Sequence, residues 1–312
     1  MAKIRALNGA AASGLCFGCM QFGGTADEAA SRAMFAACRA AGINFFDTAH
    51  TYTGGASETI LGDCLKQDRE TLIVATKAAY TGGSGRDNIL SQFDESQARL
   101  KVDVVDILYL HRWDQDTPLE ETFAALCDLQ QAGRIRHIGV SNFAAWQVMK
   151  AQTVARALGT EIDIIQPMYS LVKRQAEVEL FPMALSEGID VAPYSPLGGG
   201  LLTGKYLQGG TGRLATDTRY AARYGPDWMA DTAAALSRLA ADRGVAAATL
   251  AVAWAAQNPA VTAPIISARN VEQLEPSLAA LNTTLNEDDY ALIESMSPRP
   301  APATDRLEEA TS

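Results

Sequence analysis

The chain has 312 residues, of which 48% are hydrophobic and 20% charged, and its formal net charge at pH 7 is -10. This length accommodates one large α/β barrel or two ordinary domains. The negative charge repels phosphate groups, which argues against a nucleic-acid partner or an anionic membrane surface. No apolar stretch approaches the roughly 18 residues that cross a bilayer, and no signal-peptide pattern follows the first residues. We therefore expect a cytoplasmic protein without a membrane partner.

The five cysteines, at positions 16, 19, 38, 64 and 127, are odd in number and scattered. This distribution is typical of a reducing compartment and not of a disulfide framework. Cys16 and Cys19 have the C-x-x-C spacing of a redox or metal pair. No second pair and no suitably spaced histidine accompany them, and they do not open a helix. We favour the other interpretation, in which they are small buried residues of a strand.

Apolar runs alternate with helix-like segments along the chain, which is typical of repeated βα units around a parallel sheet. A short N-terminal hairpin is expected first, because Asn8-Gly9 suits a two-residue type I′ turn. No linker divides the chain, so we predict a single domain over residues 1–312. Eight strands are predicted over residues 15–19, 44–47, 72–77, 104–111, 137–141, 164–167, 190–194 and 262–267.

The predicted helices begin at capping residues and end at glycines. Thr25 and Glu28 have the spacing of a capping box, and the helix that they open ends at Gly42. The later helices are predicted over residues 88–100, 119–132, 145–158, 177–187, 228–243, 246–258, 271–281 and 287–296. Residues 196–226 contain too many glycines for regular structure and predict a long loop that is functional or mobile. The proline-rich end, about 298–312, is predicted to be a flexible tail.

Charged or titratable residues close three consecutive apolar runs. Asp47, Lys77 and His111 end these runs, and Tyr52 follows the first of them. The C-terminal ends of neighbouring parallel strands meet at one rim of a sheet. There an ammonium would lower the pKa of the phenol, a carboxylate would keep that ammonium charged, and the imidazole could hydrogen-bond a carbonyl oxygen. The set offers no activated nucleophile and no metal-ligand spacing, so it predicts chemistry with an external reductant or oxidant.

These residues and the segments around them resemble the aldo-keto reductase family, of the bacterial NADP-dependent type, from about Gly14 to Leu292. The resemblance implies an α/β fold, a (β/α)8 TIM barrel with a short N-terminal β-hairpin and extra C-terminal helices. It also implies that the four residues are the catalytic tetrad, with Tyr52 as general acid and base. The matching segments are 46–49 with Tyr52, 75–77, 106–111, 133–143, 166–170 and 194–198.

The resemblance implies a nicotinamide dinucleotide bound without a Rossmann domain, and no G-x-G-x-x-G follows the first strand. Arg269 suits a 2′-phosphate, because its fork binds anions bidentately, so NADP(H) is preferred over NAD(H). Ser267 and Ser277 depart from the glycine and asparagine common in the family. The residues implied to hold the cofactor are Gly18, Cys19 and Met20 at the ribose; Ser141, Asn142 and Gln166 at the carboxamide; Tyr194 on the nicotinamide ring; Ser195, Pro196, Leu197, Gly199, Leu201, Gly204 and Lys205 at the pyrophosphate; and Ile266, Ser267, Ala268, Arg269, Gln273 and Ser277 at the adenosine end.

Gln21, Phe22, Tyr80 and Trp113 flank the tetrad and are expected to line the substrate mouth. We therefore predict an oxidoreductase that transfers a hydride between NADP(H) and the carbonyl or alcohol carbon of a small aldehyde, ketone or sugar-like substrate. One alternative is a channel-associated regulatory subunit, a kind of protein that resembles this family and turns NADPH over slowly. Another is a Schiff-base aldolase with Lys77 as nucleophile. The physiological substrate, the direction of the reaction and the oligomeric state stay open.

Overall fold

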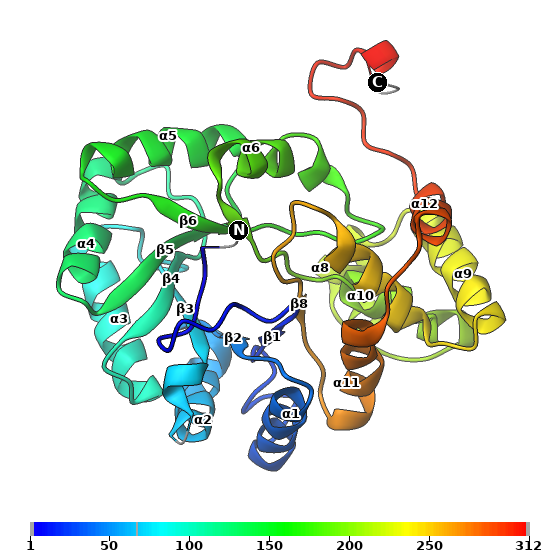
Figure 1. The fold of residues 1–312 in the computed structure, drawn as a ribbon, viewed down its shortest axis with the longest axis horizontal. Coiled ribbons are helices and arrows are strands. Elements are labelled where there is room, and N and C mark those ends of the chain that lie inside the picture. Colours follow the sequence, from blue (N-terminus) through cyan, green and yellow to red (C-terminus); the bar gives the residue numbers. More distant parts are fainter. Residues whose placement is uncertain (1–2, 67, 310–312) are drawn as a thin grey trace.

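The parallel strands curl around a common core (Figure 1). The computed structural model describes residues 3–66 and 68–309. Its eight-stranded sheet has the order β7-β6-β5-β4-β3-β2-β1-β8. The two ends meet where Ile265 N donates to Pro193 O at 2.8 Å, beside a parallel bridge between Tyr194 and Ile265. The strands are β1 (Cys16–Gly18), β2 (Phe45–Asp47), β3 (Ile73–Ala78), β4 (Val105–Leu110), β5 (Ile135–Ser141), β6 (Ile162–Gln166), β7 (Asp190–Val191) and β8 (Ile265–Ile266). The predicted fold class is confirmed, and a strand overlaps each of the eight predicted ranges, although β7 and β8 are shorter than predicted and β5 and β6 begin two residues earlier.

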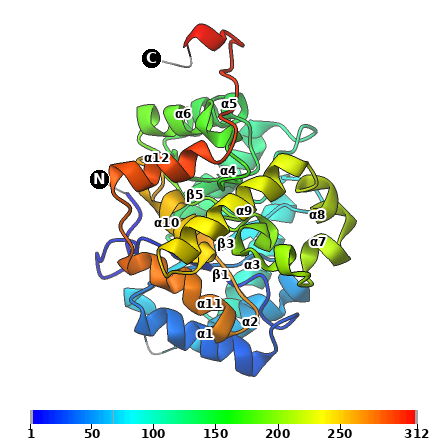
Figure 2. The same cartoon turned by 90° about the vertical axis from the view of Figure 1, so that its right-hand side faces the viewer.

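Helices α1 to α6 each follow the strand of the same number and cover the outside of the barrel (Figure 1). The segment between β7 and β8 carries α7 to α10, and α11 and α12 follow β8; these helices gather on one side of the molecule (Figure 2). The helices are α1 (Glu28–Ala40), α2 (Ala56–Leu65), α3 (Arg86–Leu100), α4 (Leu119–Gln131), α5 (Ala145–Ala157), α6 (Leu180–Glu187), α7 (Arg213–Thr216), α8 (Thr218–Arg223), α9 (Asp227–Asp242), α10 (Ala247–Gln257), α11 (Val271–Leu278) and α12 (Glu287–Ser295).

Three local predictions are wrong. The cap of α1 is Asp27 and not Thr25, because the Asp27 carboxylate accepts the Ala30 N–H at 2.8 Å. The N-terminal hairpin exists as one antiparallel bridge between Arg5 and Ala11, but its turn is not type I′, since Asn8 does not have a positive φ. Helix α6 begins at Leu180, because a separate 3₁₀ turn over Gln175–Glu177 precedes it.

The loop prediction for residues 196–226 is also incomplete. Two short helices, α7 and α8, form within it, after the 3₁₀ segment Gly198–Thr203. The glycines of that segment leave room for aromatic rings, since a Cβ on Gly199 would lie 2.8 Å from the Tyr220 ring. Tertiary packing of α8 against the glycines thus gives this segment a structure that local composition does not predict.

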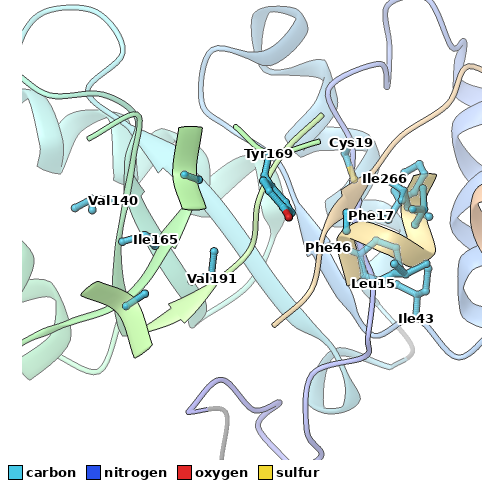
Figure 3. Close-up of a cluster of buried hydrophobic side chains, with 14 of the residues drawn as sticks. Leu15, Phe17, Cys19, Ile43, Phe46, Val140, Ile165, Tyr169, Val191 and Ile266 are labelled. Carbon is cyan, nitrogen blue, oxygen red and sulfur yellow. The ribbon is translucent and has the colours of Figure 1, made fainter. Parts of the chain in front are cut away.

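Strand alternation divides the core into two layers. Cys16, Phe45, Ile73, Ile107 and Ile164 fill the barrel interior, whereas their neighbours along each strand pack outward against the helices. Figure 3 shows part of the outer layer, with Phe17 and Phe46 on one side and Val140, Ile165 and Val191 on the other. Along each strand every second side chain points into the barrel. This alternation continues to the C-terminal ends of the strands and determines which strand-end residues face inward.

Beyond α12 the chain runs away from the barrel towards the C-terminus (Figures 1 and 2). The flexibility of this tail stays a prediction, and residues 310–312 lie outside the described residues. Within residues 3–66 and 68–309, no single helix is long and apolar enough to cross a membrane; α9 and α10 pass that test only as a pair bent by 105°.

Candidate active site

The strand register brings the predicted tetrad to one rim of the barrel. Gly18 of β1 pairs with Asp47 of β2, and Lys77 of β3 pairs with Tyr109 of β4. Asp47 follows the interior residue Phe45 by two positions, and Lys77 follows Ala75 by two, so both side chains point into the barrel. His111 follows interior Tyr109 in the same way. The backbone N–H of His50 donates to Lys77 O at 3.1 Å, which ties the loop carrying Tyr52 to β3.

Lys77 is the centre of this cluster. Its side chain is 1% exposed, and its ammonium donates to Asp47 Oδ1 and, at 2.7 Å, to the carbonyl of Thr48. The same nitrogen lies 5.0 Å from the centre of the Tyr52 ring. Burial alone would lower the pKa of Lys77, but the charge of Asp47 and the Tyr52 phenol raise it above its ordinary value. Lys77 is therefore a buried cation, which disfavours its use as an amine nucleophile for a Schiff base.

The pKa of Tyr52 differs from our expectation. Burial raises this pKa above its ordinary value of 10.0, and the nearby ammonium of Lys77 opposes the shift without reversing it. The prediction that Lys77 brings the pKa of Tyr52 below its ordinary value is wrong, because desolvation of the phenolate outweighs the attraction. Tyr52 consequently holds its proton at neutral pH.

His111 lies beside Tyr52, with their ring centres 5.8 Å apart in an edge-on arrangement. Burial, and then the charges of Lys77 and Arg112, lower the pKa of His111 to about 3. The imidazole is therefore neutral at physiological pH. Its Nδ1 is buried and has no hydrogen-bond partner within the described part of the chain. A neutral imidazole beside a protonated phenol can hydrogen-bond an oxygen atom without bringing a positive charge to it.

The residues predicted at the nicotinamide form one hydrogen-bonded network with the tetrad. Gln166 Nε2 donates to Asp47 Oδ2 at 2.9 Å, and Ser141 Oγ donates to Gln166 O at 2.9 Å. Asn142, which has a left-handed φ of 59°, donates from Nδ2 to His111 O at 2.9 Å. The Tyr194 hydroxyl donates to Asn142 Oδ1 at 2.7 Å. The ends of β5 and β6 and the segment after β7 therefore converge on the same rim as the tetrad.

The predicted pyrophosphate loop is compact and rich in left-handed backbone. Ser195 has a φ of 62°, and Gly204 one of 76°. A Cβ on Gly200 would lie 3.1 Å from Lys205 Nζ, so the ammonium lies directly against this backbone. No carboxylate pairs with Lys205 in residues 3–66 or 68–309. The side chain of Leu201 is buried in the core, so only its backbone is available to a ligand.

The predicted adenosine segment follows β8. The Ser267 hydroxyl is buried without a hydrogen-bond partner among the described residues. Arg269 and Gln273 are exposed, whereas Ile266, Ala268 and Ser277 are buried. The Asn270 side chain caps α11, because its Oδ1 accepts the backbone N–H of Gln273 at 2.9 Å. Arg269 is therefore the cationic side chain that this segment presents to solvent.

Phe22, predicted at the substrate mouth, and Cys19, predicted at the cofactor ribose, both lie in the core. Phe22 is fully buried, with its ring 5.6 Å from that of Phe17, and Cys19 is fully buried in the outer core layer. Gln21 is 7% exposed and accepts a hydrogen bond from Thr25. A Cys19 contact with a ligand could involve only its backbone. Two residues separated by an odd number of positions along a strand point to opposite faces of the sheet. The spacing of three between Cys16 and Cys19 therefore indicated that their side chains face opposite ways.

The same alternation settles the C-x-x-C pair. Cys16 belongs to the barrel interior and Cys19 to the outer layer. Both thiols are free and buried, and burial raises the pKa of each well above its ordinary value. The interpretation of small buried residues is confirmed. No group of three or more potential metal ligands occurs in the described ranges.

At the rim, the ring of Tyr80 lies 4.8 Å from that of His111 and is 43% exposed. Trp113 packs edge-on against Phe143 with a centroid distance of 5.2 Å. Met20 is half-buried in the turn after β1. Tyr80 thus lies at the mouth beside the tetrad, while Trp113 contributes to an aromatic wall.

Sequence reasoning missed two residues of α8, Tyr220 and Arg223. The Arg223 guanidinium lies over the Tyr220 ring, 5.3 Å from its centre. Tyr220 contributes to raising the pKa of Tyr52, and the charge of Arg223 opposes the effect of burial on Tyr194, whose pKa is raised to about 12. Both residues are therefore within electrostatic range of the rim. The only available signal was the unusual length of the loop after β7.

A separate cavity of about 420 Å³ lies at the opposite end of the strands, beside His137 and Asp163 near the starts of β5 and β6. The two arginines that line it, Arg136 and Arg156, are paired with Asp106 and Glu187. Because the active sites of such barrels lie at the C-terminal rim, this cavity is not the candidate active site.

A parallel barrel with an acid, a phenol, an ammonium and an imidazole at its C-terminal rim is a barrel enzyme of the oxidoreductase kind, and comparison with known proteins identifies its family. The model of the aldo/keto reductase family matches residues 14–298. A probable voltage-gated potassium channel subunit beta from rice is 34% identical over 84% of either chain. An uncharacterized oxidoreductase, YrpG, from Bacillus subtilis is 33% identical over 94% of either chain. L-glyceraldehyde 3-phosphate reductase from Escherichia coli is 31% identical over 81% of this chain and 79% of that protein. The chain belongs to the aldo/keto reductase family.

Proposed function

We propose that this protein is an NADPH-dependent reductase of small aldehydes or ketones, with Tyr52 as general acid. The observation that carries the proposal is the buried ion pair of Lys77 and Asp47 beneath a protonated phenol. In addition, the five cysteines carry free thiols, which supports our proposal of a reducing, cytoplasmic location.

Several features fit a nicotinamide dinucleotide. Lys205 presents an ammonium beside glycine backbone, and within residues 3–66 and 68–309 no carboxylate pairs with it, which suits a pyrophosphate. The buried Ser267 hydroxyl, which has no hydrogen-bond partner among the described residues, suits a polar group at the adenosine end. Asn142 and Gln166 are the amides that would orient the carboxamide, and Tyr194 would cover the ring. When bound, such a cofactor supplies the hydride that reduces a carbonyl carbon.

The chain's own residues then handle the proton. Tyr52 donates its proton to the carbonyl oxygen, and the neutral His111 hydrogen-bonds the same oxygen and orients it. The Lys77 ammonium stabilises the phenolate that remains, and Asp47 keeps Lys77 charged. At neutral pH Tyr52 is protonated, His111 is neutral and Lys77 is charged. These are the states that carbonyl reduction requires, which supports the reductive direction.

The experiment that tests this function is a screen of small aldehydes and ketones with NADPH and NADH side by side, monitoring loss of the reduced cofactor. Turnover with several aldehydes supports the proposal. Absence of turnover, together with tight NADPH binding, would favour a cofactor-sensing subunit. The similarity to the rice protein, a probable voltage-gated potassium channel subunit beta, favours that second candidate.

The pH dependence of reduction follows from the shifted pKa values of Tyr52 and His111. We expect kcat/KM to be flat between about pH 6 and about pH 9 and to fall above about pH 10, because Tyr52 loses its proton only above its ordinary pKa. His111 adds no step near neutrality, since its pKa is about 3. Initial rates in a series of buffers at constant ionic strength measure the profile. An inflection near pH 6.5, the ordinary pKa of histidine, would contradict the neutral imidazole.

Cofactor preference is proposed to depend on Arg269, which is exposed and unpaired in the described part of the chain. Replacing Arg269 with glutamine should lower kcat/KM for NADPH about 10- to 100-fold, the usual range for losing a hydrogen-bonded charge. The value for NADH is the internal control and should change less than about twofold. Equal loss with both cofactors would place the 2′-phosphate contact elsewhere.

A further inference from the structure

Three cations surround the rim without carboxylate partners. We call Arg112, Lys173 and Arg223 the cationic rim. Arg112 follows His111, and Arg223 ends α8. Within residues 3–66 and 68–309, no Asp or Glu oxygen lies within 4.0 Å of their nitrogens, although most other arginines of the chain form ion pairs. In a chain with a net charge of -10, unpaired cations at one place are an exception to the overall field.

Each of the three cations is held by an aromatic ring. The Arg112 guanidinium lies 5.2 Å from the centre of the Tyr80 ring, and Arg223 lies 5.3 Å from that of Tyr220. Lys173 Nζ lies 5.5 Å from the Tyr224 ring. Stacking over a ring holds a guanidinium in place and leaves its edge N–H groups free to bind an anion bidentately. The arginines are thus held in position for an anion that the protein itself does not provide.

The rings connect the cations to the reacting groups. Tyr80 contacts His111, with ring centres 4.8 Å apart. Tyr220 and Tyr224 lie 6.2 Å apart, and both pack against Gly199. On this side the charge of Arg223 also opposes the rise that burial causes in the pKa of Tyr194, whose hydroxyl donates a hydrogen bond to Asn142 Oδ1. Arg112, which follows β4, and Arg223, at the end of α8, therefore approach the rim from two different segments.

Lys173 and Arg223 repel each other. Burial and then the charge of Arg223 lower the pKa of Lys173, and no carboxylate opposes this effect. Two like charges held together without a counter-ion are unfavourable, and a bound anion would relieve the repulsion. The two cations lie over neighbouring rings, those of Tyr224 and Tyr220, so this repulsion supports the ligand chemistry that the stacking indicates.

We propose that the cationic rim binds a carboxylate or phosphate group of the substrate, so that the preferred substrates are small aldehydes or ketones with an anionic group. This inference rests on the proposed function and names its substrate class. Lys205, in the glycine segment, remains the cation proposed for the cofactor pyrophosphate, and it is distinct from the three rim cations. Electrostatic attraction would also speed the approach of such a substrate to an otherwise acidic protein.

The test compares 4-carboxybenzaldehyde with its neutral methyl ester, methyl 4-formylbenzoate, using NADPH. The wild type should prefer the carboxylate in kcat/KM by about tenfold or more, and the preference should shrink as salt rises. A second comparison, of glyceraldehyde 3-phosphate with glyceraldehyde, tests a phosphate group. The pair with the larger ratio of kcat/KM identifies the anion that the rim prefers. Equal kcat/KM within both pairs would overturn the proposal.

Variants separate the rim from the cofactor. R223Q, and independently K173Q, should lower kcat/KM for the carboxylate about tenfold and leave the ester within about twofold. R219Q is the matched control, because Arg219 lies on the same helix and is paired with Asp217. If R223Q and K173Q instead raise KM for NADPH equally with both aldehydes, the cations serve the cofactor and the proposal is wrong.

A binding measurement keeps this test independent of turnover. With NADPH present, 4-carboxybenzyl alcohol cannot react, so its dissociation constant can be measured by calorimetry against that of its methyl ester. The wild type should bind the carboxylate more tightly, and R223Q should remove the difference. If the protein binds the carboxylate selectively but reduces no aldehyde, the proposed function is wrong and the anion site of the cationic rim is supported. If it reduces aldehydes without preferring anions, the proposed function is supported and the anion site is wrong.

Discussion

Replacement of Tyr52 by phenylalanine is expected to slow NADPH-dependent carbonyl reduction by about 100- to 10,000-fold, the usual contribution of a general acid. The phenol is the protonated group beside the neutral His111, and the substitution removes its proton without changing the shape of the ring. NADPH binding, measured by fluorescence titration, should stay within about twofold. The loss should therefore fall on kcat and not on cofactor affinity.

Tyr109 provides the matched control for this experiment. Its ring lies 5.8 Å from the same Lys77 nitrogen, but it is fully buried inside the barrel, and its hydroxyl has no hydrogen-bond partner in the part of the chain that is described. The Tyr109→Phe variant should keep nearly wild-type turnover, because its hydroxyl faces no substrate. Unchanged turnover in Tyr52→Phe would show that another group donates the proton.

Much of the fold could be predicted because it depends on short periodic patterns. The eight apolar runs were located within a few residues, and their alternation explains why Asp47 and Lys77 both face the barrel interior. The positions of these two residues follow from adjacent strands with a fixed register. Chemistry at strand ends is therefore the part of a barrel site that sequence predicts best.

The mouth of the site could not be predicted in the same way. Arg223 reaches the rim because α8 packs its tyrosines against Gly199, a contact between segments with no periodic signal. The pKa of Tyr52 was predicted in the wrong direction, because the proximity of Lys77 can be inferred from a motif but the extent of burial cannot. Substrate specificity and proton affinity depend on tertiary packing, which a linear pattern does not contain.

Replacement of Lys77 by methionine is expected to have the largest effect on stability, about 3–5 kcal/mol in the free energy of unfolding. Asp47 is 3% exposed and would lose the cation that balances its charge. It would keep the Gln166 amide as a hydrogen-bond donor, but an amide does not neutralise a carboxylate. Urea denaturation followed by circular dichroism measures the loss, and turnover should fall in the same variant because the phenolate of Tyr52 is no longer stabilised.

The double variant D47N/K77M separates these two effects. Asparagine removes the buried charge and keeps an oxygen that can accept from Gln166 Nε2, so the double variant should recover most of the stability lost in K77M. It should not recover turnover, because the ammonium next to Tyr52 is still missing. If the double variant regained activity together with stability, Lys77 would be a structural residue, and Tyr52 would transfer its proton without help from the buried cation.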